Sequence, residues 1–395
     1  MTRKSERKRR FLIGLSCALC AVGVLSAVAL GALSPIWLLG VVALLVAMHR
    51  AMIANTGIAV LTYHSVSPDP AWLPWSRETS VHPDTFRAHC ETLQAMGLRV
   101  IGSREFVDLR EAGEPRRRDL AVIHLDDGYR DNWQFAVPEL RQRGLPATFF
   151  VSLDFIEPGD DIRDDSDLSG YMNWPELAAV EAIEGLEVEP HGVDHARVPV
   201  SDRAIDVLTP ANWRRHAWLQ WHRTEGPKHD WFRHEHPPSA QLGELVPESD
   251  LALAAPAWRD GGRESEREFA ARVSEQLSLC QTVLAERLGH VPTIFCWPEN
   301  KTSARSREIA AQLGYRATTG GKGRNTASER VDIISRIHMG DRALGFRWLP
   351  AERLHLRAAT RLAQGNLYWF ALVAPMNATR KLVFAWRSRF GRPFA

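Results

Sequence analysis

The chain contains 395 residues with a formal net charge of +2, and this length can bury a large core in one domain or two. Both ends are basic and the middle is therefore acidic, which argues against a basic nucleic-acid groove, so we predict no nucleic-acid partner. Of the five cysteines, two lie in an apolar N-terminal stretch and three are widely spaced. We therefore interpret all five as free thiols that require no oxidising compartment.

The N-terminus combines a basic tail, residues 1–10, with a stretch that contains no charged residue up to Met48. One crossing of a ~30 Å hydrocarbon core needs about 20 residues, so this stretch is too long for one straight span or for a signal-peptide core. We predict a membrane anchor over residues 11–54, with helices at Phe11–Leu33 and Ile36–Ala54.

The number of spans decides on which side of the membrane the rest of the chain lies. The positive-inside rule keeps the basic tail in the cytoplasm, and a helical hairpin returns the following domain to the same side. One tilted span followed by an interfacial helix would instead place the domain in the periplasm or outside the cell. Because the run before Met48 resembles a span, we expect a hairpin in a bacterial inner membrane and a cytoplasmic domain.

Apolar runs and amphipathic segments alternate through the next part of the chain, which predicts a parallel α/β sheet, either doubly wound or closed into a barrel. Such folds place their sites at the C-terminal ends of the strands. The predicted strands are Gly57–Tyr63, Leu98–Ile101, the run from Leu120 up to Asp126, Pro146–Ser152, Gly185–Pro190, Thr293–Trp297 and Tyr315–Thr318. The predicted helices are Pro83–Met96, Asn132–Arg143, Trp174–Ala182, Glu264–Arg287 and Ser303–Leu313.

Residues 197–262 interrupt this alternation and are rich in Trp and His. We expect an insertion over the mouth of the sheet or barrel. Its Trp residues suit sugar faces, but the more frequent role of Trp in an insertion is a small core of its own. The irregular spacing of the histidines in residues 229–236 favours a solvated loop over a metal site.

Two polar motifs stand at predicted strand ends. Adjacent side chains point in different directions, so one of Asp126 and Asp127 could bind a metal while the other faces a substrate; the alternative is a solvated Asp-Asp-Gly turn. His191 and His195, four residues apart, can face one ion if the segment between them coils. Together with Asp127 they would leave a coordination position open for water, which is typical of a catalytic metal.

The chain resembles the polysaccharide deacetylases, the NodB-homology carbohydrate esterases. The resemblance covers residues 57–336 apart from the insertion and predicts a deacetylase domain over residues 57–350. It implies a distorted (β/α) barrel and metal-dependent hydrolysis of an N-acetyl group on an amino sugar. The matching segments are Leu61–Val66, His82–Phe86, His124–Tyr129, Ala147–Val151, Trp174, His191–His195, Phe295–Pro298 and Leu313–Thr319.

The resemblance also implies roles for single residues. Asp127, His191 and His195 would bind a divalent metal, Zn²⁺ before Co²⁺ or Ni²⁺. Asp126 would be the general base, and the metal with a backbone N–H would hold the oxyanion. The early Tyr-His motif resembles the branch that deacetylates poly-N-acetylglucosamine, in which His64 would be the general acid.

Three points stay open. His338 is the alternative acid, and His64 could instead be a core histidine beside Tyr63. Where the family usually has Pro-Tyr-Gly, this chain has Pro298-Glu299-Asn300, so its sugar pocket or oxyanion donor differs. We expect the substrate-binding wall to contain the residues Tyr129, Trp297, Pro298 and Glu299.

The C-terminal segment, residues 351–395, mixes Trp and Phe with Arg and Lys. Its apolar runs are too short to span a bilayer; it suits either an interfacial helix on anionic lipid or a helix packed on the barrel.

The chain is therefore expected to be a membrane-anchored N-deacetylase. Its partner would be an N-acetylated amino-sugar glycan of the cell envelope, either a polysaccharide or a lipid-linked sugar. Two alternatives are a deformylase on a lipid-linked amino sugar and a non-catalytic glycan-binding component of an envelope assembly system.

Overall fold

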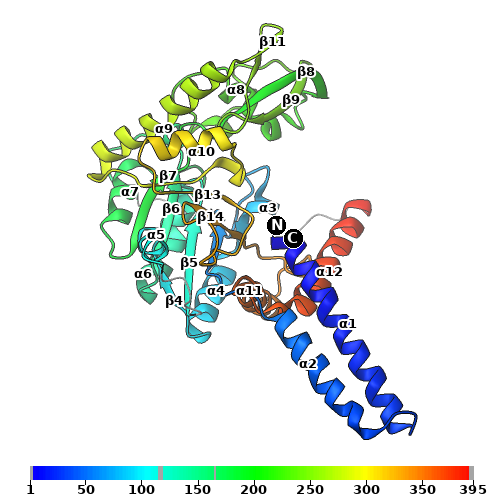
Figure 1. Cartoon of the computed structure of the whole chain (residues 1–395). Coiled ribbons are helices and arrows are strands. Elements are labelled where there is room, and N and C mark those ends of the chain that lie inside the picture. Colours follow the sequence, from blue (N-terminus) through cyan, green and yellow to red (C-terminus); the bar gives the residue numbers. More distant parts are fainter. Residues whose placement is uncertain (1–2, 114–118, 164–165, 391–395) are drawn as a thin grey trace.

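The computed structural model describes residues 3–113, 119–163 and 166–390, and its centre is a parallel sheet (Figure 1). The six strands of this sheet are β1 (Ala59–Tyr63), β4 (Arg99–Ile101), β5 (Leu120–Leu125), β6 (Ala147–Val151), β7 (Leu186–Pro190) and β15 (Ile337–His338). They pair in the order β15-β1-β5-β6-β7, with β4 beside β5, and every pair is parallel. The predicted α/β fold with a parallel sheet is confirmed.

A second, three-stranded sheet continues the first. β12 (Ile294–Phe295), β13 (Ala317–Gly321) and β14 (Ile333–Ser335) also pair in parallel. The Cys296 N–H donates to the Pro190 carbonyl at 3.0 Å and so joins β12 to β7. On the other side, only Arg336 separates β14 from β15. The strands therefore follow one another round a ring, and their C-terminal ends lie at one rim.

Side chains on the strands alternate between two buried clusters. Leu61 and Ile123 join an outer cluster with residues of the surrounding helices, whereas Val60 and Val122 join an inner cluster with residues of β6, β12, β13 and β14. Because both faces are buried, these strands are continuous apolar runs in the sequence. The larger helices of this domain are α4 (Pro83–Ala95), α5 (Ser103–Glu111), α6 (Val137–Arg143), α7 (Trp174–Glu181), α9 (Glu266–Leu288) and α10 (Ala304–Gln312).

The insertion has its own antiparallel strands, which the sequence did not predict. β8 (Arg197–Val207) pairs with β9 (Leu245–Leu251), and β10 (Trp258–Arg259) pairs with β11 (Gly262–Arg263). The insertion lies over the C-terminal side of the ring, above α9 and α10 in Figure 1. Its expected aromatic core is present but is shared with the α/β domain; this core contains Trp213, Trp218, Trp221, Trp231, Tyr129 and Tyr171.

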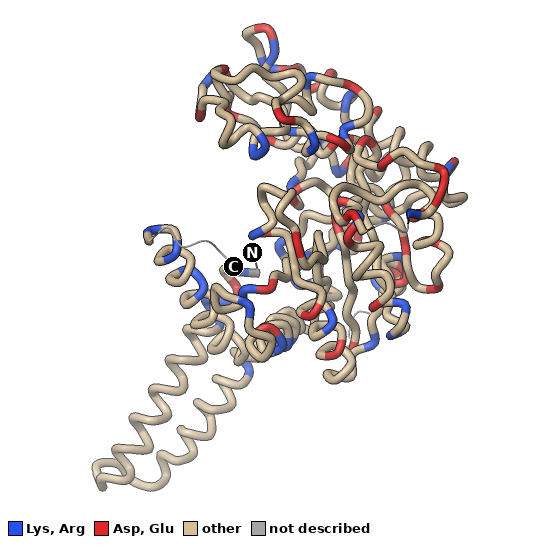
Figure 2. Tube along the Cα trace, turned by 180° about the vertical axis from the view of Figure 1, so that it is seen from behind, with Lys and Arg blue, Asp and Glu red and all other residues tan. Residues whose placement is uncertain are grey.

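A helical hairpin projects from the domain (Figures 1 and 2). α1 (Arg3–Ala29) leads through a short turn of helix, η1 (Pro35–Trp37), into α2 (Leu38–Met52). Both arms are long and apolar enough to cross a membrane by length and composition. Arg10 Nε donates to the Ala51 carbonyl at 2.9 Å, so the basic tail and the exit of α2 lie at the same end. In Figure 2 the charged residues gather at this end and on the domain. Met1 and Thr2 of the predicted tail lie outside the described residues.

The C-terminal segment forms two helices with different neighbours. α11 (Leu349–Ala363) packs on the domain, where Leu356 is buried in the outer cluster. α12 (Phe370–Arg389) begins at the base of the hairpin, where the rings of Phe11 and Phe370 lie 5.0 Å apart. Residues 391–395 of the predicted segment lie outside the described part of the chain.

Glu352 of α11 predicts a pH-dependent stability. Its side chain is fully buried and accepts a hydrogen bond from the Ala343 N–H at 2.9 Å. Burial raises the pKa of this carboxyl to about 8, although the Ala343 N–H opposes the rise. Between pH 4.5 and 8 the unfolded chain is ionised here and the folded chain is protonated. The folded state therefore binds more protons, and Glu352 lowers the free energy of unfolding progressively as the pH rises.

Glu352→Gln removes this titration. The free energy of unfolding of the variant minus that of the wild type should therefore increase as the pH rises through this window, by up to about 5 kcal/mol. Denaturant titrations over a pH series measure the difference. Glu286→Gln, at an exposed position on α9, is the control and should show none. A difference between wild type and Glu352→Gln that does not change with pH would contradict the assignment.

Candidate metal centre and active-site cavity

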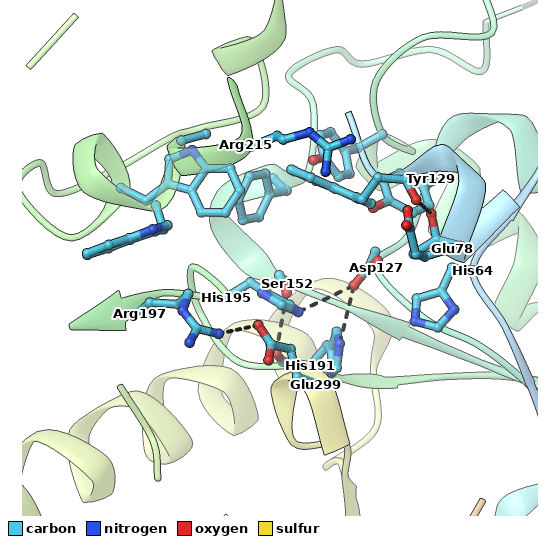
Figure 3. Close-up of a pocket in the computed structure, with 17 residues that line it drawn as sticks. His64, Glu78, Asp127, Tyr129, Ser152, His191, His195, Arg197, Arg215 and Glu299 are labelled. Carbon is cyan, nitrogen blue, oxygen red and sulfur yellow. Dashed lines mark hydrogen bonds and ion pairs between the residues drawn. The ribbon is translucent and has the colours of Figure 1, made fainter. Parts of the chain in front are cut away.

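A cavity of about 550 Å³ lies between the rim of the ring and the insertion (Figure 3). Asp127, His191 and His195 line one side of it. Across from them lie rings that belong to the aromatic core, among them Trp218 and Trp221. The cavity is therefore enclosed by residues of both the α/β domain and the insertion.

The chain brings together the three side chains predicted to hold a metal. His191 Nε2 lies 3.3 Å and His195 Nε2 lies 3.8 Å from Asp127 Oδ1. All three ligand atoms lie within 4.8 Å of one another. Ligands about 2.0–2.2 Å from a tetrahedral Zn²⁺ are themselves separated by roughly 3–4 Å, so the group is close to the size that one ion requires.

Unusual backbone conformations produce this convergence. Asp127 and His195 have positive φ angles of 74° and 50°, and the neighbouring Gly128 and Gly192 have φ angles of 70° and 95°. Non-glycine residues adopt this region rarely, although Asp and His do so more often than most. The segment between the two histidines therefore coils as expected, but through left-handed residues at a strand end and without a helix.

Hydrogen bonding prepares the site for a cation. His191 Nδ1–H donates to the Cys296 carbonyl at 2.8 Å, which leaves Nε2 as the available ligand atom. Asp127 Oδ1 is buried and accepts no hydrogen bond within the described residues. A buried acceptor without a donor is costly, and a bound divalent cation would satisfy it. The residues therefore fit the metal that the resemblance implies.

A second group of possible ligands, Asp126, His191 and Cys296, lies beside the first. Arg336 Nη1 donates to both carboxylate oxygens of Asp126, at 2.7 and 2.8 Å. This guanidinium already neutralises Asp126 and would repel a cation, so electrostatics favour the group that contains Asp127.

Arg336 sets the protonation state of Asp126. Burial raises the pKa of the Asp126 carboxyl, but the charges of Arg336, His191 and His64 lower it by more, so the pKa lies below its usual value. Asn300 Oδ1 in turn accepts from Arg336 Nε at 3.2 Å and from the Gly320 N–H at 2.8 Å. Asp126 is thus held as a carboxylate beside the three candidate metal ligands. Neither Arg336 nor Asn300 has a role that the sequence alone predicts.

The two candidate acids differ in position. His64 lines the cavity, and its Nε2 lies 3.8 Å from Asp126 Oδ2. Asn132 Nδ2 donates to the His64 carbonyl at 2.7 Å and so fixes this part of the backbone. His338 packs against the His64 ring, with the ring centres 5.3 Å apart, and its Nε2–H donates to the Glu78 carbonyl at 2.7 Å. The geometry therefore favours His64 over His338.

Only part of the predicted substrate wall reaches the cavity. Tyr129 and Glu299 line it, and Glu299 pairs with Arg197 at the start of β8. Trp297 and Pro298 are not among the residues that line it. Trp297 is fully buried against Phe295, with the ring centres 4.6 Å apart.

Several lining residues were missed because they come from segments without a recognisable motif. Trp75 donates from Nε1 to the Tyr129 hydroxyl at 3.2 Å and stacks on Trp231 at 5.3 Å between ring centres. Glu78 and Thr79 follow in α3 (Ser76–Thr79), and Arg215 of the insertion also borders the cavity. Only the three-dimensional packing brings these residues close to Asp127, His191 and His195.

The chain is similar to proteins described as deacetylases. Residues 113–236 match the family model described as polysaccharide deacetylase, and this range contains Asp126, Asp127, His191 and His195. The protein YxkH of Bacillus subtilis, which is assigned only provisionally to the polysaccharide deacetylases, is 27% identical over 138 residues. That match covers 35% of this chain and 43% of YxkH, so the chain spans less than half the length of this relative.

Two solved structures are also similar. A de-N-acetylase from Aggregatibacter actinomycetemcomitans has a TM-score of 0.50 at 18% identity, over 71% of this chain and 94% of that one. The BpsB deacetylase domain from Bordetella bronchiseptica has a TM-score of 0.49 at 18% identity, over 72% and 97%. At this identity the first likeness supports the fold alone.

Proposed function

Because this chain belongs to the polysaccharide deacetylase family, we propose that it is a metal-dependent hydrolase that removes the N-acetyl group from an amino sugar. The substrate would be a cell-envelope polysaccharide or a lipid-linked glycan. One observation carries the proposal, namely that Asp127, His191 and His195 converge on one cavity wall beside Asp126 and His64. The ring of strands corresponds, in this proposal, to the distorted (β/α) barrel of the family.

The chemistry of this donor set suits Zn²⁺ first, with Co²⁺ or Ni²⁺ as alternatives, because two imidazoles and one carboxylate leave a position open. When bound, such an ion supplies Lewis-acid polarisation of the amide carbonyl and lowers the pKa of water. Asp127, His191 and His195 would hold it, and the Cys296 carbonyl would keep the His191 ring in the required tautomer.

Asp126 would accept the proton of the attacking water. Its ionised state is secured by Arg336, and its Oδ2 lies 3.8 Å from His64 Nε2. His64, on the cavity wall, would then donate a proton to the nitrogen of the leaving amine. Base and acid would thus act from the same side of the cavity, next to the metal ligands. A non-catalytic glycan-binding protein has no need for this combination.

We further propose that the hairpin α1–α2 anchors the protein in a bacterial inner membrane with the domain on the cytoplasmic side. The contact between Arg10 and the end of α2 supports this orientation, because it keeps both ends of the hairpin together with the basic tail. The basic C-terminal helices would lie near the same surface of the membrane.

The activity is tested by incubating the full chain, loaded with Zn²⁺ in detergent, with N-acetylglucosamine oligosaccharides. Mass spectrometry of the glycan and separate measurement of acetate and formate distinguish deacetylation from deformylation on the corresponding N-formyl sugar. Acetate release that depends on Zn²⁺ is the expected result. Binding of the oligosaccharide without release of either acid would favour the glycan-binding alternative and contradict the proposal.

The identity of the acid is tested by two histidine variants. His64→Ala should lower kcat by about 10²- to 10⁴-fold, the usual contribution of a general acid. His338→Gln keeps an N–H donor for the Glu78 carbonyl and should change kcat only a few-fold. Steady-state acetate release measures both. The reverse order of effects would assign the acid to His338.

A further inference from the structure

The C-terminal half of α12 presents an apolar face to the outside. Leu382, Trp386 and Phe390 recur every four residues on this face, and the smaller exposed residues Ala371, Pro375 and Ala378 extend it toward the N-terminal end of the helix. The three large side chains are strongly exposed, Leu382 by 71%, Trp386 by 49% and Phe390 by 61%. Continuous apolar surface of this kind marks an interaction site in most soluble proteins.

The charges on α12 indicate the chemistry of the partner. The helix contains Arg and Lys but no Asp or Glu, and Lys381 and Arg389 are exposed beside the apolar face. An apolar face with Trp and Phe, bordered by basic residues, is typical of a helix that lies in the headgroup region of an anionic bilayer. Trp is also enriched at that depth.

The position of α12 agrees with such a surface. Its first residue, Phe370, packs on Phe11, and Arg7 lies over the same ring at 4.7 Å. Phe11 is the residue at which the charge-free part of the hairpin begins. In Figure 1, α12 leaves this point across the long axis of the hairpin instead of along it. A bilayer that contains the hairpin would therefore have its surface at the level of α12.

α12 also contacts the short helix that contributes to the rim of the cavity. The Arg77 guanidinium lies over the Phe384 ring, 4.0 Å from its centre. Arg77 belongs to α3, in which the next two residues, Glu78 and Thr79, line the cavity. The loop before α11 packs on α12 as well, because a Cβ at Gly345 would come within 2.6 Å of Val383 Cβ. The membrane-facing helix and the cavity rim are thus parts of one packed unit.

We propose that α12 lies on the surface of an anionic bilayer and fixes the rim of the cavity there, so that the site takes amino sugars held at the membrane. This inference rests on the proposed anchoring and deacetylase activity. It narrows the proposed substrate to an amphiphile, a sugar joined to a lipid. It also assigns the membrane contact of the C-terminal segment to α12 and not to α11.

The contact is measured on the full chain reconstituted into vesicles that contain phosphatidylglycerol. Cys17 and Cys20 are replaced by alanine, since the other three cysteines are buried. An environment-sensitive fluorophore is then attached to one new thiol, in Leu382→Cys, in Leu19→Cys on α1, or in Leu279→Cys on α9. All three positions are exposed on the isolated chain, and α9 lies far from the hairpin.

Lipids with brominated chains should quench the fluorophore at positions 382 and 19 but not at position 279. Quenching at 19 without quenching at 382 would overturn the inference and leave the anchor intact. An absence of quenching at both positions would overturn the anchor and the inference together.

The link to the cavity is tested with two double variants, each of which replaces two exposed apolar residues by glutamate. Leu382→Glu/Trp386→Glu should lower kcat/KM at least tenfold on N-acetylglucosamine joined to a lipid phosphate in vesicles, and should leave acetate release from soluble oligosaccharides unchanged. Leu279→Glu/Val291→Glu, which also replaces exposed apolar residues, should change neither. Equal effects on both substrates, or none on the lipid-linked one, would overturn the link. Acetate from neither substrate with the wild type would overturn the proposed activity, and the quenching result would stand independently.

Discussion

Asp127→Ala is expected to abolish both metal binding and amide hydrolysis. Its Oδ1 lies close to both His191 Nε2 and His195 Nε2, so its loss leaves the two imidazoles without their anionic neighbour. Metal chemistry contributes several kcal/mol to such a reaction, and each 1.36 kcal/mol is a factor of ten. The expected loss in kcat is therefore on the order of 10³-fold or more.

Metal content per chain, determined by mass spectrometry after dialysis against Zn²⁺, and acetate release are measured together. Asp127 Oδ1 accepts no hydrogen bond from the described residues that folding would then lack, but alanine adopts the positive φ of this position less readily than aspartate, so circular dichroism checks the fold. Asp108→Ala is the matched control, since Asp108 is an exposed carboxylate on α5 that pairs with Arg316. Full metal content and wild-type turnover in Asp127→Ala would contradict the assignment of the ligand.

Asp126→Asn is expected to give the opposite pattern, full metal content with little turnover. The amide cannot accept a proton from water, and loss of a general base costs about 10²- to 10⁴-fold in kcat. Metal binding should persist, because the favoured ligand group does not include Asp126. Loss of metal along with activity would show instead that Asp126 is itself a ligand.

Arg336 variants test how Asp126 is kept ionised. The guanidinium lowers the pKa of the Asp126 carboxyl, and the base acts only in its ionised form. Without this charge the pKa rises, so the acid limb of the pH profile of kcat/KM should move to higher pH in Arg336→Met. Arg336→Lys retains the charge and should restore part of the shift. Because removing one partner of a buried ion pair costs about 3–5 kcal/mol, circular dichroism of each variant checks the fold.

The convergence of the three proposed metal ligands could be predicted from sequence because they stand in short motifs at strand ends. A buried run that stops at Asp126-Asp127 and a strand that stops at His191 must present these residues at the same rim, once the strands are parallel. The parallel pairing of neighbouring strands is thus what makes the positions of these residues predictable. For the same reason the main strands and helices of the α/β domain were predicted with ends that differ by a few residues.

Arg336 and Asn300 could not be predicted, because their roles depend on the closure of the ring. Arg336 reaches Asp126 across 210 positions of sequence, and β14 and β15, which flank it, are only three and two residues long. Strands this short give little periodic signal. The pairing of β15 with β1 is what brings Arg336 to the site.

Trp297 shows how strand alternation decides a contact. Cys296 belongs to the inner cluster of the ring, so the next residue must point the other way. Trp297 accordingly packs with Phe295 and Tyr315 in the cluster that includes residues of α9 and α10. Its side chain takes part in the packing of helices on the sheet, and Glu299, two residues later, lines the cavity.

The most direct measurement is the location of the ion in crystals of Zn²⁺-loaded protein by anomalous diffraction at the zinc edge. We expect one peak within bonding distance, about 2.0–2.2 Å, of Asp127 Oδ1, His191 Nε2 and His195 Nε2. A peak between Asp126, His191 and Cys296, or no ordered zinc near these residues, would contradict the proposed centre and the hydrolytic chemistry built on it.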